Sequence, residues 1–260
     1  LAENQFSMLQ PMRILTAPLF FLLFVAFGHA QTIQKPRVSV TPLNNQVYLH
    51  VSYGIYQNAA ISSNGLVIET NDGVVLIDTG WDTPDDTDNT RQLLRFIADS
   101  LRQPVRLCIV THAHDDRVGG IAELRRAGVR VISTPQTALN AVKAGYESPE
   151  GILPADTTLT IGQVPICCYF PGEGHTRDNI VVWLPTHRIL HGGCFLKSVA
   201  TFGMGNLADA NMNEWANSVR RVMTRFGDAR VVVPGHETVS DSRALAHTLR
   251  LLEKYAEGKR

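Results

Sequence analysis

The sequence predicts an α/β fold, an αββα four-layer sandwich of two similar halves in which two sheets pack face to face and helices cover both outer faces. Three observations lead to this prediction. Short apolar segments rich in β-branched residues alternate with segments of helical periodicity. The apolar strand segments need cover on both faces. The order hairpin, helix, strand occurs twice, ending once near His112 and once near His236.

The first half contains predicted hairpins, helices and strands in this order. Asn71-Asp72-Gly73 is a strong hairpin turn signal, whereas residues 54–64 are predicted to form a loop. The helix after the hairpin begins with Thr83 as its N-cap and ends before Pro104. The predicted strands are 38–40, 47–51, 66–69, 74–77 and 105–110, and the predicted helices are 83–101 and 121–127.

Strand and helix continue to alternate after residue 127, and the hairpin ending at Cys194, the helix after it and the strand before His236 repeat the order of the first half. Thr134-Pro135 opens a helix that Gly145 closes, because threonine suits the N-cap, proline the first helical position and glycine the helix end. Residues 156–169 have the pattern of a hairpin. The remaining predicted strands are 129–133, 180–184, 188–191 and 231–233, and the remaining predicted helices are 211–226 and 242–256.

The composition is that of a globular protein, with 44% hydrophobic and 18% charged residues. The 24 basic and 24 acidic residues balance, so no net field attracts nucleic acid or a membrane surface. We therefore expect no nucleic-acid partner. The partner is expected to be a small molecule, and the protein is expected to be a monomer.

The amino-terminal segment has the pattern of a secretory signal peptide. Arg13 precedes an apolar run over residues 14–27, and the small residues Gly28 and Ala30 follow it. This run is shorter than the roughly 20 residues that a membrane-spanning helix needs. We expect residues 1–30 to be upstream residues and signal peptide, cleaved after Ala30. Residues 31–260 then form one exported domain that is free of the membrane.

Four cysteines follow this segment, and only one of them is a candidate for chemistry. Cys108 lies inside a predicted buried strand, and the adjacent Cys167 and Cys168 can hardly bond each other without strain. We expect these three to be core residues. Cys194 stands apart, because it ends a strand pair beside two glycines.

A dense group of metal-ligand side chains follows the predicted strand 105–110. The segment His112-Ala-His114-Asp-Asp116-Arg117 places imidazoles and carboxylates on a strand-to-helix turn, where short side chains can converge. Neutral imidazole and carboxylate are ligands that zinc accepts. Asp115 is expected to point away by alternation.

Three further candidates lie at turns beside glycine, just beyond other strands or hairpins: His175 in Gly-His-Thr, Cys194 in Gly-Gly-Cys and His236 in Pro-Gly-His. Together with His112, His114 and Asp116 they make six potential ligands. This number suffices for two four-coordinate zinc ions that share a water molecule.

These motifs resemble those of the class B metallo-β-lactamases, in the di-zinc subclass with a cysteine ligand on the second zinc. The match includes His-Ala-His-Asp-Asp-Arg-Val-Gly-Gly, Gly-His-Thr-Arg-Asp-Asn, Gly-Gly-Cys-Phe-Leu-Lys-Ser, Gly-Asn-Leu-Ala-Asp-Ala-Asn and Pro-Gly-His, in the family's order. It covers about residues 36–258. The resemblance implies a sandwich of the metallo-β-lactamase type and zinc-dependent hydrolysis of the β-lactam amide bond by a metal-bound hydroxide, which confers antibiotic resistance. It also implies a periplasmic location.

The resemblance also implies residue roles. Two zinc ions per chain are expected, and their ligands are His112, His114 and His175 for the first and Asp116, Cys194 and His236 for the second. Asp116 and Asn206 are the expected catalytic residues. Lys197 and Asn206 are the expected substrate-binding residues, Lys197 for the substrate carboxylate and Asn206 for the carbonyl oxygen.

Other positions are expected to support the site. Asp78, at the end of a buried strand, lies beneath the metals, and Arg117 neutralises nearby acid. Residues 54–64 correspond to the family's mobile flap, with Ile55, Tyr56 and Ile61 as apolar contacts. Trp81 is expected either to floor the pocket or to belong to the core. The histidines outside the ligand set are expected to be structural or on the surface: His29, His50, His187, His191 and His247.

Two residues depart from the family's pattern, and two other functions are alternatives. Glu173 and Glu237 place acids where the family often carries small or neutral residues, which could change substrate preference or metal affinity. The alternative function is another hydrolase of the same fold, acting on thioesters or lactones. Arg117 and Cys194 argue against it, because such enzymes usually carry histidine and a bridging aspartate at these positions. A zinc-storing module would not need Lys197.

Overall fold

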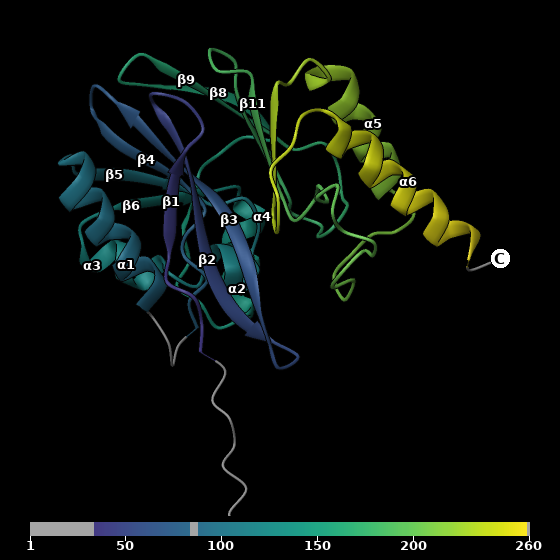
Figure 1. Ribbon diagram of the computed structural model, residues 1–260, viewed down its shortest axis with the longest axis horizontal. Helices are drawn as coiled ribbons and strands as arrows, with labels where there is room; N and C mark the ends of the chain where they lie inside the picture. The colour runs from purple at the N-terminus through teal and green to yellow at the C-terminus, as the bar shows by residue number, and fades with distance from the viewer. Residues whose placement is uncertain (1–33, 84–87, 259–260) are drawn as a thin grey trace, which may run out of the picture. The chain divides into compact units, whose positions relative to one another are not determined.

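A computed structural model describes residues 34–83 and 88–258 of the chain (Figure 1). The predicted signal peptide and the residues just after Thr83, where we predicted the first helix to begin, lie outside this described part. Within the described part, the strands form one seven-stranded and one five-stranded sheet. The predicted αββα sandwich is confirmed.

The first sheet has the strand order β1-β2-β3-β4-β5-β6-β7. β1 to β4 form an antiparallel meander, and β4 to β7 run parallel to one another. Its strands are β1 (Ser39–Pro42), β2 (Val47–Tyr56), β3 (Ala59–Thr70), β4 (Gly73–Ile77), β5 (Val105–Ile109), β6 (Arg130–Ser133) and β7 (Glu150–Gly151).

The second sheet has the order β12-β11-β10-β9-β8. Its strands pair antiparallel except β11 and β12, which are parallel. Its strands are β8 (Asp156–Ile161), β9 (Val164–Tyr169), β10 (Val181–Leu184), β11 (Ile189–Gly193) and β12 (Val231–Pro234). The predicted repeat is visible here, because each half contains a hairpin strand followed by a parallel neighbour, β4 with β5 and β11 with β12.

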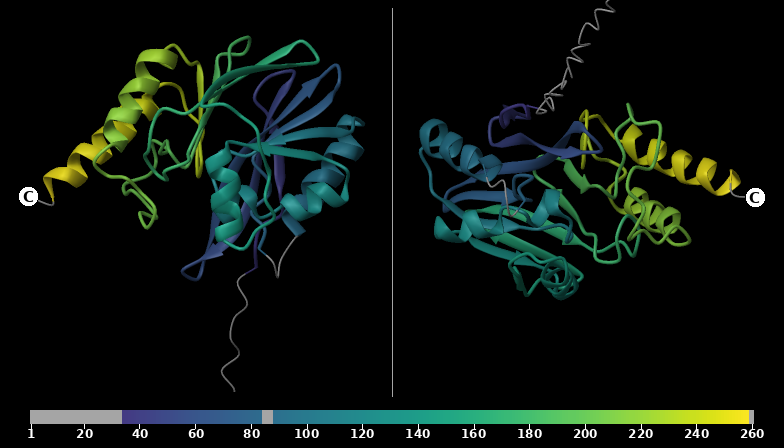
Figure 2. Two further views of the ribbon diagram at one scale, coloured as in Figure 1. Left: turned by 180° about the vertical axis from the view of Figure 1, so that it is seen from behind. Right: turned by 90° about the horizontal axis from the view of Figure 1, so that it is seen from below.

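The helices cover the outer faces of the two sheets (Figures 1 and 2). Helices of the first half lie on the first sheet, and α5 and α6 lie side by side on the second. They are α1 (Asp88–Phe96), the π-helical turn η1 (Ile97–Leu101), α2 (Asp115–Val118), α3 (Ile121–Arg126), α4 (Pro135–Lys143), α5 (Trp215–Phe226) and α6 (Arg243–Glu257).

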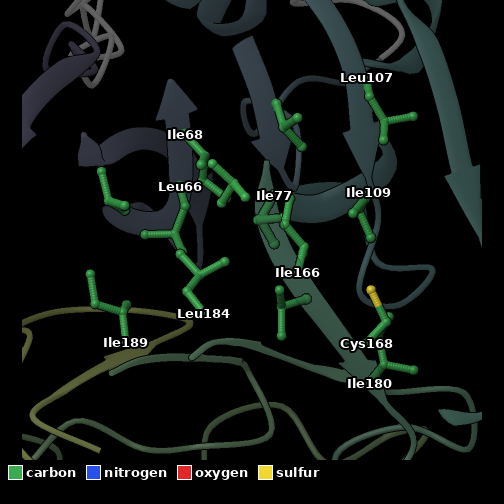
Figure 3. Packing of buried hydrophobic residues seen from close by; sticks show 14 of the residues in the cluster. Leu66, Ile68, Ile77, Leu107, Ile109, Ile166, Cys168, Ile180, Leu184 and Ile189 are labelled. Atoms are coloured by element: carbon green, nitrogen blue, oxygen red, sulfur yellow. The ribbon is translucent and has the colours of Figure 1, made fainter. Parts of the chain in front are cut away.

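Strand alternation divides the core between the layers. In β3 and β4, Leu66, Ile68 and Ile77 point into the space between the sheets, where they meet apolar side chains of the second sheet such as Ile166 and Leu184 (Figure 3). Their neighbours on the same strands, such as Val67, Val74 and Leu76, point the other way and pack under α1 and α3. Each strand is therefore buried on both faces, which explains its continuous apolar sequence.

The outer core of the second sheet follows the same rule. Val181 and Leu190 face α5 and α6, which contribute buried residues including Trp215, Val222 and Leu252. These helices bury one face each and leave their charged residues toward solvent.

The structure corrects the prediction that residues 54–64 form a loop. β2 and β3 continue through this region as a long hairpin with Tyr56 paired to Ala59. Gln57 and Asn58 both have positive φ, 48° and 59°, as a two-residue turn that follows the twist of the strands requires. Gln-Asn is a weaker turn signal than Asn-Gly, so the sequence did not predict it. The segment 54–64, called the flap below, is thus an extension of the first sheet.

The cysteines of the described part are all free. Cys108 and Cys168 are buried as expected, whereas Cys167 is only partly buried. None of the described helices is long and apolar enough to span a bilayer.

We predict that truncating the core between the sheets destabilises the protein strongly. Ile68 is fully buried and Ile55 is 45% exposed, so the two isoleucines are matched except for burial. Ile68→Ala is expected to lower the free energy of unfolding by about 2–5 kcal/mol, because it leaves a cavity. Ile55→Ala is expected to stay within about 0.5 kcal/mol of the parent. Urea denaturation followed by circular dichroism measures both, and equal effects would contradict the core described here.

Candidate metal centre

One cavity of about 400 Å³ gathers most of the predicted site residues. Its walls include residues that follow the carboxyl ends of β5, β9, β11 and β12. In both sheets the parallel pairs bring such ends to one edge, which is where ligands bind in α/β sheets. The predicted site residues on the walls are His114, Asp116, His175, Cys194, Lys197, Asn206 and His236.

Three histidines form the first group of possible ligands. His114 Nδ1 lies 3.1 Å from His175 Nε2. The ring of His112 stands edge-on to both, with centroid distances of 4.9 and 5.1 Å. One nitrogen from each ring lies within 4.8 Å of the others. His112 Nε2 is buried and has no hydrogen-bond partner among the described residues, so its lone pair is available to a metal.

The protonation of His112 and His175 favours metal binding. Burial lowers the pKa of His112 well below its usual value, and the neighbouring His114 lowers it further. Burial also lowers the pKa of His175, with a smaller contribution from Lys197. Both rings are therefore neutral at physiological pH, which is the form that binds metal ions.

Asp116, Cys194 and His236 form the second group. Cys194 Sγ lies 3.4 Å from Asp116 Oδ2 and 3.2 Å from His236 Nε2. His236 Nε2 is 3.6 Å from the same carboxylate oxygen. His112 adjoins this group, since one of its nitrogens lies within 4.8 Å of Asp116 and Cys194 ligand atoms. The two groups are thus neighbours in one centre.

Burial and charge act in opposite directions in the second group. Burial raises the pKa of the Cys194 thiol to about 12, although Arg117 opposes this. Burial would also raise the pKa of Asp116, but Arg117 and His236 outweigh it and lower the pKa. A cation bound between these side chains favours both the thiolate and the carboxylate.

Arg117 lies directly beneath the second group and is fully buried. Its Nη2 lies 2.8 Å from Asp116 Oδ2 and donates to Cys194 Sγ at 3.1 Å and to the Gly235 carbonyl at 2.8 Å. Its Nη1 donates to the Asn64 carbonyl at 2.5 Å and to Asp78 Oδ2 at 3.1 Å. The expected role of Arg117, neutralising nearby acid, agrees with these contacts.

Asp78 is also fully buried and anchors the underside of the centre. The Thr111 backbone N–H donates to one carboxylate oxygen at 2.8 Å, and the Thr111 hydroxyl donates to the other at 2.9 Å. His191 Nε2 lies 2.9 Å from the second oxygen. His191, which we expected to be structural, therefore holds Asp78 rather than a metal.

Outer contacts fix which nitrogen of His236 and of His114 faces the centre. His236 Nδ1 lies 2.6 Å from the Ser62 carbonyl, which leaves Nε2 toward Cys194. His114 Nε2 lies 2.9 Å from Asp209 Oδ2, which leaves Nδ1 toward His175. Such contacts orient metal-binding histidines.

Lys197 and Asn206 both lie on the cavity wall, as predicted. Lys197 is buried, and its Nζ lies 5.3 Å from the centre of the Trp215 ring. Burial lowers its pKa, while Cys194 and Asp116 oppose that shift. Asn206 is exposed, and its Oδ1 accepts a hydrogen bond from the Ala208 N–H at 3.0 Å. The wall thus offers one cation and one amide beside the metal ligands.

The flap and its neighbours supply the apolar wall. Tyr56 and Ile61 line the cavity as expected, whereas Ile55 is not on its walls. Trp81 both lines the cavity and is 8% exposed, so it combines the two roles considered for it. Asp115 was expected to point away, but it lines the cavity too, because the chain turns into α2 at this residue and strand alternation ends.

Sequence reasoning missed two contacts of the centre. Asp209 lies within the Gly-Asn-Leu-Ala-Asp motif, so the motif contained the signal, but its contact with His114 was not foreseen. Thr201 on the cavity wall donates to Glu237 Oε2 at 2.7 Å, and nothing in the local sequence indicates this pair.

The donor set suits zinc. Imidazole nitrogen, thiolate and carboxylate are the ligands that zinc binds, and they lie here in two adjacent groups. The unpaired nitrogen of His112 and the buried thiol of Cys194 are the observations that fit a bound metal best.

Comparisons with known proteins agree with this geometry. Residues 59–236 match the family described as the Metallo-beta-lactamase superfamily. A Metallo-beta-lactamase type 2 of Bacillus cereus is 43% identical over 216 residues, which are 83% of this chain and 83% of the relative. One of Bacteroides fragilis is 34% identical over 244 residues, 92% of this chain and 96% of the relative.

A solved structure gives the same result. The Metallo-beta-lactamase from Pontibacter korlensis has a TM-score of 0.79 and 40% identity, over 84% of this chain and 99% of that one. Both its fold and its sequence are thus similar to those of this chain.

We predict that the stability of the fold depends on Arg117. Arg117→Met keeps the approximate volume but leaves Asp78 and Asp116 without their buried cation. The free energy of unfolding is expected to fall by about 3–5 kcal/mol. Arg220 is a matched control, since its ion pair with Glu253 lies at the surface, and Arg220→Met should cost less than about 1 kcal/mol. Urea denaturation distinguishes the two, and equal losses would show that Arg117 is not central.

Proposed function

The chain belongs to the metallo-beta-lactamase superfamily, and on this premise we propose that it hydrolyses the amide bond of β-lactam rings with bound zinc and so confers resistance to these antibiotics. The observation that carries the proposal is the meeting of two ligand groups and Lys197 in one cavity. A cavity that only stored metal would need no buried cation on its wall. A β-lactam carries a carboxylate close to its reactive amide, which such a cation can bind.

We assign two zinc ions to the centre. His112, His114 and His175 hold the first, and Asp116, Cys194 and His236 hold the second. The short distances within each group support this assignment. The neutral state of His112 and His175 supports it as well.

The chain's own residues bind and orient the substrate. Zinc, when bound, supplies Lewis acidity and a water molecule that is nucleophilic near pH 7. Lys197 binds the substrate carboxylate, and Asn206 helps to hold the carbonyl oxygen in the reaction. Asp116 acts beside the reacting atoms as a ligand whose negative charge Arg117 maintains. Tyr56, Ile61 and Trp81 cover apolar parts of the substrate.

Export completes the proposal. We propose that residues 1–30 contain a signal peptide, that residues 31–260 are the mature enzyme, and that this enzyme acts as a monomer in the periplasm. The apolar run over residues 14–27 and the small residues after it support this view. β-Lactams must cross that compartment, so hydrolysis there intercepts them.

Hydrolysis of thioesters or lactones is the weaker candidate. The positions of Arg117 and Cys194 disfavour it, because Arg117 neutralises Asp116 and donates to Cys194. The second ligand group is thus built around the cysteine.

We predict that β-lactam hydrolysis depends on zinc. The purified mature protein, given a penicillin, a cephalosporin and a carbapenem, is expected to hydrolyse at least one of them. A chelator should abolish this activity, and added zinc should restore it, since the bound zinc supplies the Lewis acidity and the nucleophilic water. Loss of β-lactam absorbance measures the rate. A protein with two bound zinc ions that hydrolyses none of the three would instead favour thioester or lactone substrates.

We predict that Cys194→Ser removes one zinc equivalent of the two. Serine is a poor zinc ligand at neutral pH, so the second group loses its strongest donor. Metal analysis of the purified protein measures the loss, and kcat/KM should fall at least about tenfold. Cys167→Ser is the matched control, because Cys167 lies on β9 away from the cavity. Unchanged zinc content in Cys194→Ser would refute the assignment.

A further inference from the structure

Glu237, the residue after His236, has a backbone conformation that is rare for a residue with a side chain. Its φ is 62°, in the left-handed region. Two contacts with the flap side of β3 hold it there. The Glu237 N–H donates to Ser62 Oγ at 3.0 Å, and Asn64 Nδ2 donates to the Glu237 carbonyl at 2.8 Å. These main-chain contacts thus fix the direction in which the Glu237 side chain points away from the backbone.

The side chain of Glu237 is exposed and lines the cavity. Its Oε2 accepts a hydrogen bond from Thr201 Oγ1 at 2.7 Å. Thr201 belongs to the loop between Lys197 and Asn206, the two residues proposed to bind substrate. A neighbouring contact ties the same loop to the next residue, since Ser198 Oγ lies 2.9 Å from Thr238 Oγ1. Glu237 is therefore held close to the substrate-binding loop.

Three other acidic residues lie on the cavity wall, and Glu237 differs from each of them: two have a basic side-chain partner, and the third, Asp115, is only partly exposed, whereas Glu237 is exposed. Asp116 is paired with Arg117, and Asp209 with His114. Among the described residues, Glu237 has no basic partner within ion-pair distance, and its contact with Thr201 leaves its charge unneutralised. Its field reaches Lys197, since it opposes the lowering of that pKa by burial. The wall near Lys197 therefore carries an anion as well as a cation.

We propose that Glu237 is a specificity-determining residue that favours β-lactams with a cationic substituent next to the ring carboxylate. This inference rests on the proposed function. In a cephalosporin the carboxylate and the variable exocyclic substituent are on adjacent ring carbons. When Lys197 binds the carboxylate, the substituent lies beside the loop that Glu237 contacts. A cationic substituent there gains an attraction, and a neutral one does not.

Cephaloridine and cephalothin test this inference as a matched pair. They share the same acylamino side chain, and they differ in that cephaloridine carries a pyridinium where cephalothin carries a neutral acetoxy group. Glu237→Gln removes the charge but keeps an oxygen that can accept from Thr201. The ratio of kcat/KM for cephaloridine to that for cephalothin is expected to fall about twofold to fivefold, the range for an exposed ion pair. The change should lie mainly in KM and shrink at high salt.

Two control variants separate the charge from other roles. Thr201→Val removes the hydrogen bond to Glu237 but keeps the Glu237 carboxylate. The ratio of kcat/KM for cephaloridine to that for cephalothin should therefore equal that of the parent. Glu173→Gln removes an acid that is paired with Arg177 and absent from the cavity walls, so it too should leave that ratio. Zinc content is measured for each variant, because Glu237 follows a proposed ligand.

The outcomes are distinct. A parent enzyme that hydrolyses a penicillin or a carbapenem but neither cephalosporin overturns only the role of Glu237, whereas one that hydrolyses none of these β-lactams contradicts the proposed function itself. Hydrolysis of both with an unchanged ratio in Glu237→Gln overturns only the role of Glu237. If the cephaloridine-to-cephalothin ratio falls as much in Thr201→Val as in Glu237→Gln, the position of the loop and not the charge determines the preference. That result also overturns the role of Glu237. If Glu237→Gln folds poorly, Glu237→Gly, which suits the left-handed conformation, should give the same fall in the ratio.

Discussion

The buried guanidinium of Arg117 is the contact on which the two halves of the site depend. Its donors reach Asp78 and Asp116 of the first half and Cys194 and Gly235 of the second. Few other side chains could do this, because a planar fork with five N–H donors can bind several acceptors at once while remaining charged. Burying that charge is costly alone, and it is tolerated here because carboxylates, a thiol and backbone carbonyls surround it. The edge that carries the proposed metal ligands therefore depends on the buried guanidinium of Arg117.

The repeated organisation of the chain explains why the ligands converge. In the first half, β4 ends at Ile77, directly before Asp78, and its parallel neighbour β5 leads to His112. In the second half, β11 ends at Gly193, directly before Cys194, and its parallel neighbour β12 leads to His236. Both sheets bury their strands on two faces, so neither can shift its register without exposing apolar side chains. The rigid core thus places loops that are distant in sequence around one cavity.

The sequence predicted the layers and the site residues because both depend on local patterns. Alternating strand and helix segments fixed the fold class, and glycine-flanked motifs located His175, Cys194 and His236. Contacts between distant segments could not be predicted in the same way. The pair His114 and Asp209 spans 95 positions, and the pair His191 and Asp78 spans 113. The flap was mistaken for a loop because Gln57 and Asn58 adopt positive φ without the usual glycine.

Left-handed backbone conformations occur at three positions around the centre, and surrounding hydrogen bonds hold the two that are not glycine. Asp78, Gly193 and Glu237 have φ of 65°, 52° and 62°. Gly193 directly precedes Cys194, and Glu237 directly follows His236. Asp78 contacts Arg117, which in turn donates a hydrogen bond to Cys194. A glycine adopts this region at little cost, but an aspartate or glutamate does so only where other contacts compensate. Asp78 has its bonds to Thr111, and Glu237 has those to Ser62 and Asn64. Because these strained residues and the bonds that hold them lie next to the proposed ligands, the folded chain restricts where the ligands can lie.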